Sequence, residues 1–341
     1  MRNLENKNVV DAIETELGNN IIRKSLIDDG DKLVVAVSGG PDSMCLLTSL
    51  IDLKEILEKQ YSIKYSIVVA HVNHMIREES EKEKEYVENY CKKENIPFYY
   101  LKKDVKTLSR QERMSEEAYG RMIRYDFFNE VLEKEKAQKI VTAHNANDDI
   151  ETILLNIFRG CGLKGLTGIE FKYKNIIRPL ITVGKKDIMK YNDLKKLNPC
   201  IDKTNFELIC TRNKVRNVLI PEIENEYNPN ILNSILRMKN ILAEDEEFLN
   251  NYTLNIVKHS IIEYNENIKF NYEKILKEHI SIRKRAIREL IKLKINNLDG
   301  LSNIHINDIL ELLQNGHKGK KYIMGNKFRI EILSKNIAIL Y

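Results

Sequence analysis

Short apolar runs alternate with amphipathic stretches along the first half of the chain. The apolar runs are rich in β-branched and aromatic residues, as buried strands are, and occupy residues 34–37, 67–72, 98–101, 139–143 and 176–180. Stretches with helical periodicity lie before, between and after these runs, at residues 9–24, 44–57, 78–94, 115–136 and 185–197. This alternation predicts an α/β fold with a doubly wound, parallel five-stranded sheet.

The pattern changes near residue 218. A helix is expected from Thr211 to about Pro221, and residues 231–262 have the periodicity of one or two long helices. Residues 322–330 contain a Gly-Asn turn between apolar stretches, which predicts a β hairpin, and residues 337–341 are expected to pair with it as a third strand. We therefore expect an α/β domain at 1–217 and a mainly helical domain at 218–341 that ends in a small β hairpin.

The first predicted strand ends in a glycine-containing loop, Ser38-Gly39-Gly40-Pro41-Asp42-Ser43. Glycine lets the backbone turn with positive φ and brings its N–H groups close to a ligand. Ser43 is placed to cap the following helix, whose N-terminus carries unpaired donors and a partial positive charge. These features predict a cradle for phosphate or pyrophosphate. The loop has the spacing of neither a Walker A motif nor a Rossmann loop.

Acidic residues follow the fourth predicted strand, at the edge of a parallel sheet where ligands bind. His144 comes directly after that strand. A helix starting near residue 146 would place Asp148 and Glu151 on one face of its positive end. Such acids are suited to hold a magnesium ion that bridges ATP phosphates, or they are ordinary first-turn acids that offset the helix dipole. For Asp149 alone the second interpretation is favoured.

Three groups of cations are candidates for contacts with phosphate. Arg121 and Arg124 lie three residues apart on a predicted helix, a spacing suited to clamp a phosphate or an RNA backbone, although for this pair taken alone a solvated helix face is favoured. Arg212 and Arg216 begin and end a five-residue segment with three cations, which indicates phosphate contacts. The third group forms a basic stripe with a four-residue repeat: Lys284, Arg288 and Lys292. An RNA-contacting surface and a solvated helix face are both open for this stripe.

Composition and charge limit the class of protein without defining its function. The 341 residues are 43% hydrophobic and 31% charged, as in a globular protein, and the net charge of +5 is too small to indicate nucleic acid by itself. The five cysteines form no C-x-x-C pair, which favours a reducing, cytoplasmic setting. No apolar run approaches the ~20 residues that a membrane span requires, so no membrane partner is expected.

Five segments occur in an order that identifies a family. They are residues 38–43, 71–77, 121–125, 144–160 and 202–216. The order closely resembles that of the tRNA(Ile)-lysidine synthases, which belong to the N-type ATP pyrophosphatases or PP-loop enzymes. The most specific segments are His-Val-Asn-His-x-x-Arg at 71–77, Asp-x-Thr-Asn at 202–205 and Arg-Asn-x-x-Arg at 212–216. The resemblance covers about residues 30–225, and the helical remainder matches in type only.

The resemblance implies a ligase that uses ATP, Mg2+ and free L-lysine on a tRNA(Ile) with a CAU anticodon. ATP would adenylate the oxygen on carbon 2 of the wobble cytidine with release of pyrophosphate. The ε-amine of lysine would then displace AMP and give lysidine. The residues 1–217 would form the PP-loop catalytic domain and the residues 218–341 a tRNA-contacting domain.

The resemblance also implies a role for each candidate residue. ATP would be bound by Ser38, Gly39, Gly40, Pro41, Asp42, Ser43, Ala70 and His71. Asp42 and Asp148 are expected to hold magnesium and to orient the lysine ammonium, and Arg121 and Arg124 to offset charge in the transition state. His144 is expected to assist proton transfer because the pKa of histidine lies near neutrality. The tRNA would be contacted by Arg212, Arg216, Lys284, Arg288 and Lys292.

Two departures from the family pattern and several alternatives remain. Asn145 and Asp149 stand where family members often have His and Gln, so neither is assigned a role. The chain is shorter than many bacterial relatives with an extra carboxy-terminal domain, which leaves tRNA discrimination open.

A PP-loop tRNA thiolase would need cysteines, of which Cys45 and Cys161 are nearest the predicted site loops. A GMP or NAD synthetase would need an ammonia source, and a nucleotide-gated RNA-binding protein would lack catalysis. The oligomeric state is open, with a homodimer as one alternative.

Overall fold

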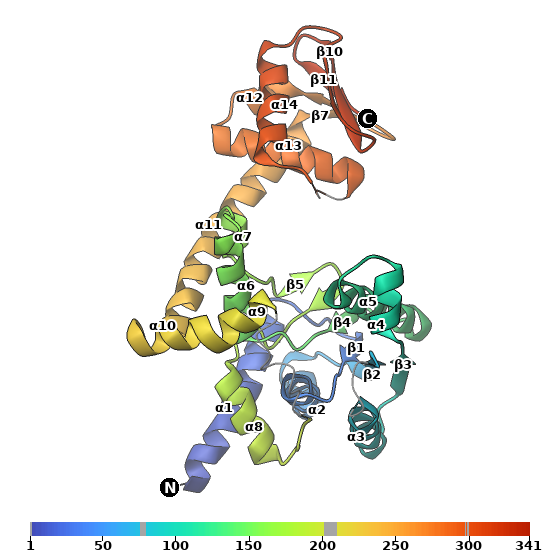
Figure 1. Ribbon diagram of the computed structural model, residues 1–341, viewed down its shortest axis with the longest axis vertical. Helices are drawn as coiled ribbons and strands as arrows, with labels where there is room; N and C mark the ends of the chain where they lie inside the picture. Colours follow the sequence, from blue (N-terminus) through green and yellow to red (C-terminus); the bar gives the residue numbers. More distant parts are fainter. Residues whose placement is uncertain (1, 76–79, 201–209, 297, 299) are drawn as a thin grey trace. The chain divides into compact units, whose positions relative to one another are not determined.

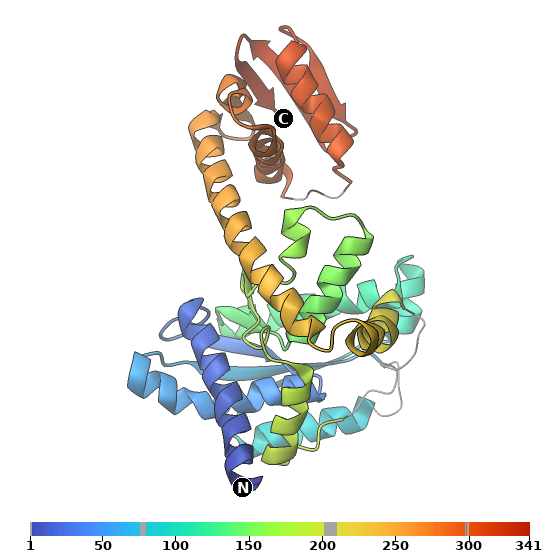
Figure 2. The ribbon, with the colours of Figure 1, turned by 90° about the vertical axis from the view of Figure 1, so that its left-hand side faces the viewer.

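The chain forms two compact units, Met1–Lys239 and Asn240–Tyr341. The computed structural model describes residues 2–75, 80–200, 210–296, 298 and 300–341. One long helix, α11 (Ile231–Ser260), runs uninterrupted through the boundary between the units (Figure 2). In the described part of the chain, no helix is long and apolar enough to cross a membrane.

The first unit is built on a six-stranded sheet in the order β3-β2-β1-β4-β6-β5. All five predicted strands are present and parallel: β1 (Lys32–Ala36), β2 (Ser66–Asn73), β3 (Phe98–Lys102), β4 (Lys139–Val141) and β6 (Ile176–Ile177). A sixth strand that the periodicity did not predict, β5 (Lys172–Tyr173), pairs antiparallel with β6 at the edge. The chain moves outward from β1 in both directions, so β1 and β4 flank the switch point where such sheets bind ligands.

Helices cover both faces of this sheet, as the continuous apolar runs predict (Figure 1). Leu33 and Val35 of β1 lie in one core with residues of α1 (Arg2–Arg23), α2 (Pro41–Tyr61), α3 (Ser80–Lys93) and α8 (Lys185–Lys195). Val34 points to the opposite face, where α5 (Glu116–Glu135) packs through Phe127 and Val131. The short helix α4 (Val105–Gln111), absent from the predicted elements, precedes α5. The alternation along β1 therefore divides the core into two layers.

A separate helical layer follows the sheet. It contains α6 (Ala146–Phe158), the short α7 (Leu163–Leu166), and a continuous segment made of α9 (Thr211–Lys214), the π-helix η2 (Val215–Leu219) and α10 (Ile220–Glu226). The expectation that a helix ends at Pro221 is wrong, because this proline stands in the first turn of α10, where a missing N–H is tolerated. Val215, Ile220 and Ile235 share one core with Ile150 and Ile153 of α6. The boundary between the units therefore falls within α11 rather than near residue 218.

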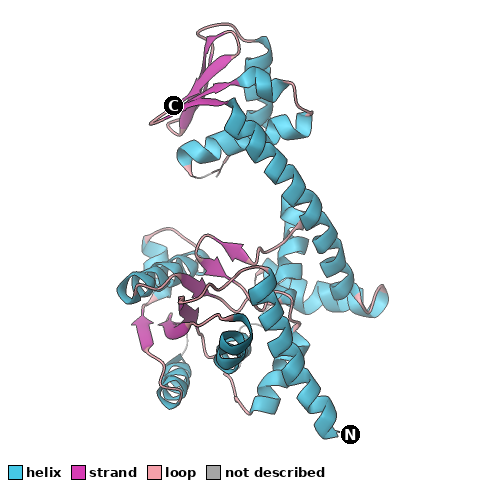
Figure 3. Cartoon of the chain, turned by 180° about the vertical axis from the view of Figure 1, so that it is seen from behind, coloured by secondary structure: helices cyan, strands magenta, loops and turns pink. Residues whose placement is uncertain are grey.

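The second unit packs helices on an antiparallel sheet (Figure 3). The sheet order is β7 (Ile261–Tyr264), β8 (Ile268–Asn271), β11 (Ile337–Leu340), β10 (Phe328–Ser334) and β9 (Lys321–Met324). The predicted hairpin is β9–β10 and the predicted third strand is β11, both confirmed, while β7 and β8 extend the sheet further. The helices α12 (Tyr272–Leu276), α13 (Ile280–Ile295) and α14 (Asn303–Asn315) supply the rest of the core.

Candidate active site

The loop after β1 is held in a tight turn by its own serines. The Ser38 N–H donates to Ser43 Oγ at 3.2 Å, and Ser43 Oγ donates to the Gly40 carbonyl at 2.9 Å. Gly39 has φ +87°, a conformation that favours glycine, and a Cβ there would lie 3.3 Å from Val87. Gly40, and not Ser43, is the N-cap of α2, so the expected capping role of Ser43 is wrong. Ser43 instead fixes the shape of the turn in front of the α2 N-terminus.

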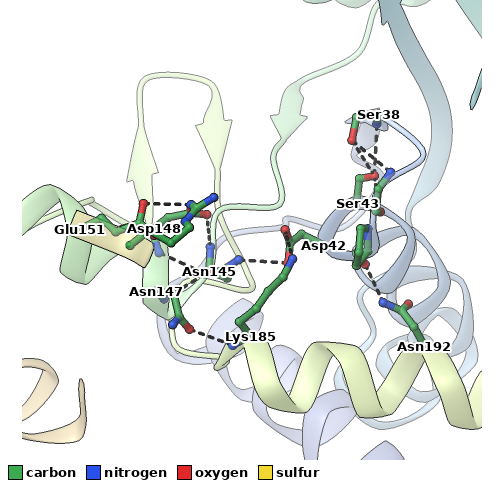
Figure 4. A network of polar contacts seen from close by, with 12 residues as sticks. Ser38, Asp42, Ser43, Asn145, Asn147, Asp148, Glu151, Lys185 and Asn192 are labelled. Carbon is green, nitrogen blue, oxygen red and sulfur yellow. Dashed lines mark hydrogen bonds and ion pairs between the residues drawn. The ribbon is translucent and has the colours of Figure 1, made fainter. Parts of the chain in front are cut away.

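Asp42, in the first turn of α2, is paired with a cation that sequence reasoning did not identify (Figure 4). Lys185 Nζ lies 2.7 Å from Asp42 Oδ1 and 2.6 Å from Oδ2. Lys185 is the first residue of α8, and its backbone N–H donates to Asn147 Oδ1 at 2.9 Å. The only sequence signal was a lysine at a helix start after the fifth strand, which is too common to single out.

Asn145, to which the sequence gave no role, joins the two acidic parts of the site. Its side chain caps α6 by accepting from the N–H groups of Asn147 and Asp148 at 2.9 and 3.1 Å. The Asn145 N–H in turn donates to Asp148 Oδ2 at 3.2 Å, which completes a capping box. Asn145 Nδ2 also donates to Asp42 Oδ1 at 3.1 Å. Asp42 and Asp148 therefore both contact one residue, as Figure 4 shows.

The carboxylates of α6 bind two arginines from the 211–219 segment. Glu151 is fully buried and accepts from Arg212 Nε at 2.7 Å and from Arg216 Nε at 2.6 Å. Asp148 Oδ1 lies 3.2 Å from Arg212 and 3.0 Å from Arg216. The expected tRNA-facing role of the two arginines does not account for these contacts, because both guanidinium groups are turned toward α6. Their side chains keep 34% exposure, so one edge of each remains open.

His144 is half-buried beside this network, with Nδ1 3.0 Å from Thr142 Oγ1. Burial lowers the pKa of His144 to about 4. The charge of Asp148 acts to raise this pKa, whereas the charges of Arg178 and Arg121 lower it further. The expectation that its pKa lies near neutrality is therefore wrong, and the imidazole is neutral at pH 7. Arg121 and Arg124 lie on exposed positions of α5, and the Arg121 guanidinium stacks 4.8 Å from the centre of the Tyr125 ring.

Ala70 and His71 support the end of β1 rather than open into solvent. The Ala70 carbonyl accepts from the Val37 N–H at 3.0 Å, and His71 Nδ1 lies 2.8 Å from the Val37 carbonyl oxygen. The buried His71 ring stacks on Tyr100 with 5.9 Å between ring centres, and burial lowers its pKa. Their assignment to ATP binding stays a prediction.

Comparison with known proteins gives the family. A family model described as a PP-loop domain matches residues 11–223. The chain belongs to the PP-loop domain family. The described glycine-containing turn, Asp42 and the α6 acids all lie within the matched residues.

Several curated relatives of this PP-loop protein are named tRNA(Ile)-lysidine synthase. The chain is 40% identical over 295 residues to the tRNA(Ile)-lysidine synthase of Caldanaerobacter subterraneus subsp. tengcongensis. The aligned residues cover 86% of this chain and 62% of that protein. It is 41% identical over 325 residues to the tRNA(Ile)-lysidine synthase of Clostridium tetani, which covers 91% of this chain and 65% of that protein. The chain thus spans less than two thirds of the length of these relatives.

A solved structure supports the PP-loop fold. The U34-tRNA thiolase NcsA from Methanococcus maripaludis is similar over 70% of this chain and 80% of its own, with a TM-score of 0.56 and 18% identity. At this identity the likeness is one of fold.

Asp149 has a structural function in the PP-loop domain that the sequence did not reveal. It is fully buried, forms an ion pair with Lys239 of α11, and accepts from the Ile169 N–H at 2.6 Å. Burial raises its pKa, against the lowering effect of Lys239. Asp149 lies in the first turn of α6, as expected, but its contacts with Lys239 and Ile169 give it a further role in packing. Gly168, with φ +63°, leaves room for this carboxylate, because a Cβ there would overlap Asp149 Oδ1.

The remaining candidates are not brought into this network. The basic stripe lies on α13 in the second unit, where Arg288 donates to Asn303 Oδ1 at 2.7 Å and Lys292 lies 3.4 Å from Glu289. Arg77 and the segment 202–205 lie outside the described residues. Among the residues that the structure describes, no three His, Cys, Asp or Glu side chains converge as a metal site.

Proposed function

We propose that the protein forms lysidine on the wobble cytidine of a tRNA(Ile) with a CAU anticodon. The observation that carries the proposal is the similarity to curated tRNA(Ile)-lysidine synthases, at 40–41% identity over 86–91% of this chain. The oxygen on carbon 2 of the cytidine attacks the α-phosphorus of ATP and releases pyrophosphate. The ε-amine of free L-lysine then bonds to carbon 2, AMP leaves with that oxygen, and the amine gives up a proton.

The turn of residues 38–43 is the proposed site of the ATP phosphates. Its backbone precedes the α2 N-terminus, whose unpaired N–H groups and dipole favour an anion. Ala70 and His71 of β2 brace the strand end from which the turn departs. The exposed Arg121 and Arg124 would offset charge that develops on phosphate during both steps.

Asp42 and Asp148 are the proposed magnesium ligands. Both contact Asn145, and Mg2+ commonly takes one or two carboxylates together with phosphate oxygens, so the pair fits this mode. When bound, the ion would neutralise phosphate charge. Each carboxylate is now balanced by the chain's own cations, Asp42 by Lys185 and Asp148 by two arginines. The ion would compete with Lys185 for Asp42 and with the two arginines for Asp148.

The same carboxylates are suited to hold the substrate lysine. Asp42 already accepts an ammonium group, that of Lys185, on both oxygens, which supports an orienting role toward the lysine substrate. His144 is neutral at pH 7 and is therefore assigned proton transfer as a weak base. Arg212 and Arg216 would hold Asp148 and Glu151 in place through their ion pairs and present their open edges to the tRNA.

The cysteines give little support to the thiolase alternative. Cys45 and Cys91 are buried, and burial raises the pKa of each thiol to about 12, which disfavours the reactive thiolate. Cys161, on the loop before α7, is half-buried. Of the two cysteines named from the sequence as candidates for thiolase chemistry, Cys161 is therefore the one that stays open.

A labelling assay tests the proposal. The protein is incubated with ATP, Mg2+, labelled lysine and a transcript of tRNA(Ile) with a CAU anticodon, and in parallel with tRNA(Met), which shares that anticodon. Label in the isoleucine tRNA alone is the expected result. Label in both supports the chemistry and assigns discrimination to a segment beyond this chain. Pyrophosphate release without label would contradict lysine as the nucleophile, and neither product from folded protein would overturn the proposal.

A further inference from the structure

Arg178 is a buried cation without a carboxylate partner in the described part of the chain. It follows β6 directly, and its side chain belongs to a residue only 6% exposed. Nη1 donates to the Glu170 carbonyl at 2.8 Å, whereas Nε has no hydrogen-bond partner. A buried charge without an ion pair is costly, and a buried donor without an acceptor adds to that cost. Such a residue is expected where an anion completes the site.

A second arginine interacts with the same tyrosine as Arg178, Tyr125. Arg178 makes a side-chain hydrogen bond with Tyr125. Arg121 stacks 4.8 Å from the centre of the Tyr125 ring and donates to its hydroxyl at 3.5 Å. Two guanidinium groups, one from α5 and one from the end of β6, therefore interact with the same phenol.

The surroundings of the pair are electropositive. Burial lowers the pKa of Arg178 and of His144; the charge of Arg121 adds to both effects, and the charge of Arg178 adds to the effect on His144. The neighbouring carboxylate of Glu170 acts on Arg178 only at a distance, because the direct contact is with its carbonyl. Asp148, which also acts on His144, is itself occupied by Arg212 and Arg216.

We propose that Arg121 and Arg178, which both interact with Tyr125, form a phosphate-binding pocket and that Arg178 fixes the phosphate by its planar fork. Guanidinium groups match the geometry of phosphate oxygens in two parallel hydrogen bonds, which a lysine cannot reproduce. The pocket is made by α5 and the end of β6, and so is built from different elements than the turn at the α2 N-terminus. The inference deepens the proposed function, on which the choice of ligand rests: a phosphate of ATP or a phosphodiester of the tRNA.

Binding measurements on three variants test the pocket and identify the source of the phosphate. Arg178→Lys keeps the charge and removes the fork, Arg121→Gln removes an exposed charge, and Arg110→Gln removes an exposed charge on α4 as the matched control. Each protein is titrated with a non-hydrolysable ATP analogue, and separately with the tRNA transcript over a range of salt concentrations, without lysine present.

The pocket predicts that R178K and R121Q weaken one of these ligands about tenfold or more, and that R110Q weakens neither. If the tRNA supplies the phosphate, its affinity falls and R121Q reduces the salt slope by about one. If ATP supplies it, the analogue affinity falls and tRNA binding is unchanged. Folded R178K and R121Q that bind both ligands like the unaltered protein would overturn the pocket.

A folding check, and the absence of lysine from the binding assay, keep the result decisive. Circular dichroism checks that R178K is folded, and if it is not, the exposed R121Q alone decides between the outcomes. Because binding is measured without lysine, it is independent of lysidine formation. If R121Q and R178K weaken binding but the unaltered protein makes no lysidine, the pocket is supported and the proposed function is contradicted. If the unaltered protein makes lysidine but neither variant weakens binding, the proposed function is supported and the pocket is contradicted.

Discussion

Asp148 is the residue on which the site contacts converge, since it caps its own helix and accepts from two arginines. We predict that Asp148→Asn lowers lysidine formation by at least about 10²-fold while tRNA binding stays within about twofold. The amide keeps an oxygen for the Asn145 N–H but loses the charge that magnesium and lysine require. Turnover by the labelling assay and tRNA affinity by filter binding give the two readings. Unchanged turnover in this variant would contradict the assignment of Asp148.

Glu151 differs from Asp148 in being fully enclosed, which makes it a stability residue as well. Glu151→Gln leaves Arg212 and Arg216 without their main counter-charge, so we expect a loss of about 3 kcal/mol in the free energy of unfolding. Urea unfolding measures the loss. Glu55→Gln, which breaks the exposed Glu55–Lys59 pair, is the matched control and should leave the midpoint unchanged.

His144 gives stability a pH dependence with a definite sign. Its pKa is lowered from 6.5 to about 4 by burial, so between these values the unfolded chain binds a proton that the folded chain does not. The contribution is fully present above pH 6.5 and is lost as the pH falls to 4, about 3 kcal/mol in all. From pH 7 to pH 4 the free energy of unfolding of the wild type should therefore fall by about 3 kcal/mol relative to that of His144→Gln, whose amide does not titrate in this range. Parallel curves would disprove the shift.

At the scale of elements, the loop after α7 positions α11 through Asp149. Gly168→Ala places a methyl group against the Asp149 carboxylate and strains a backbone at φ +63°. Gly160→Ala meets the same backbone penalty at φ +71° with nothing within 4 Å, so it isolates the conformational cost. We expect G160A to lower the free energy of unfolding by about 1 kcal/mol and G168A by more than about 2 kcal/mol. Equal losses in the free energy of unfolding for the two variants would show that the Asp149 carboxylate can move aside without destabilising the protein.

The elements of the PP-loop sheet were predictable from sequence because both faces are buried and each strand is a continuous apolar run. The two-residue β5 and the strands β7 and β8 were missed, since strands this short carry too little periodicity. The π-helix at Val215–Leu219 was also not predicted from the sequence. It brings Val215 and Ile220, five residues apart, into one core with α6, which an α-helical pattern does not do.

The site was predictable where one segment carries its own motif, and less so where distant residues meet. The turn of residues 38–43 and the acids of α6 could be named as candidates because each lies within one segment with a characteristic spacing; their roles stay predictions. Lys185, Arg178 and Lys239 were missed, because a single cation has no signal until folding brings it to a carboxylate, a tyrosine or a buried helix end. The pKa of His144 likewise depends on burial that sequence does not report.

At the scale of the whole molecule, tRNA binding should depend on salt through the α13 stripe. We predict that the double variant Lys284→Gln, Lys292→Gln reduces the slope of log affinity against log salt by about one to two. Arg288 is left in place because it donates to Asn303. Lys318→Gln with Lys320→Gln, exposed positions in the same unit, is the control. A flat response of the unaltered protein between ~50 and ~200 mM salt would rule out the stripe as an RNA surface.

The ion pairs around Asn145 have a consequence for how substrates enter. Asp42, Asp148 and Glu151 are matched by Lys185, Arg212 and Arg216, so this part of the site carries no net charge before anything binds. If the proposed assignment of Asp42 and Asp148 is right, an arriving magnesium ion or lysine ammonium would take the place of a cation that the chain already supplies. Long-range attraction would then contribute little to binding, and selectivity would depend on how well each cation fits the carboxylates in size and coordination.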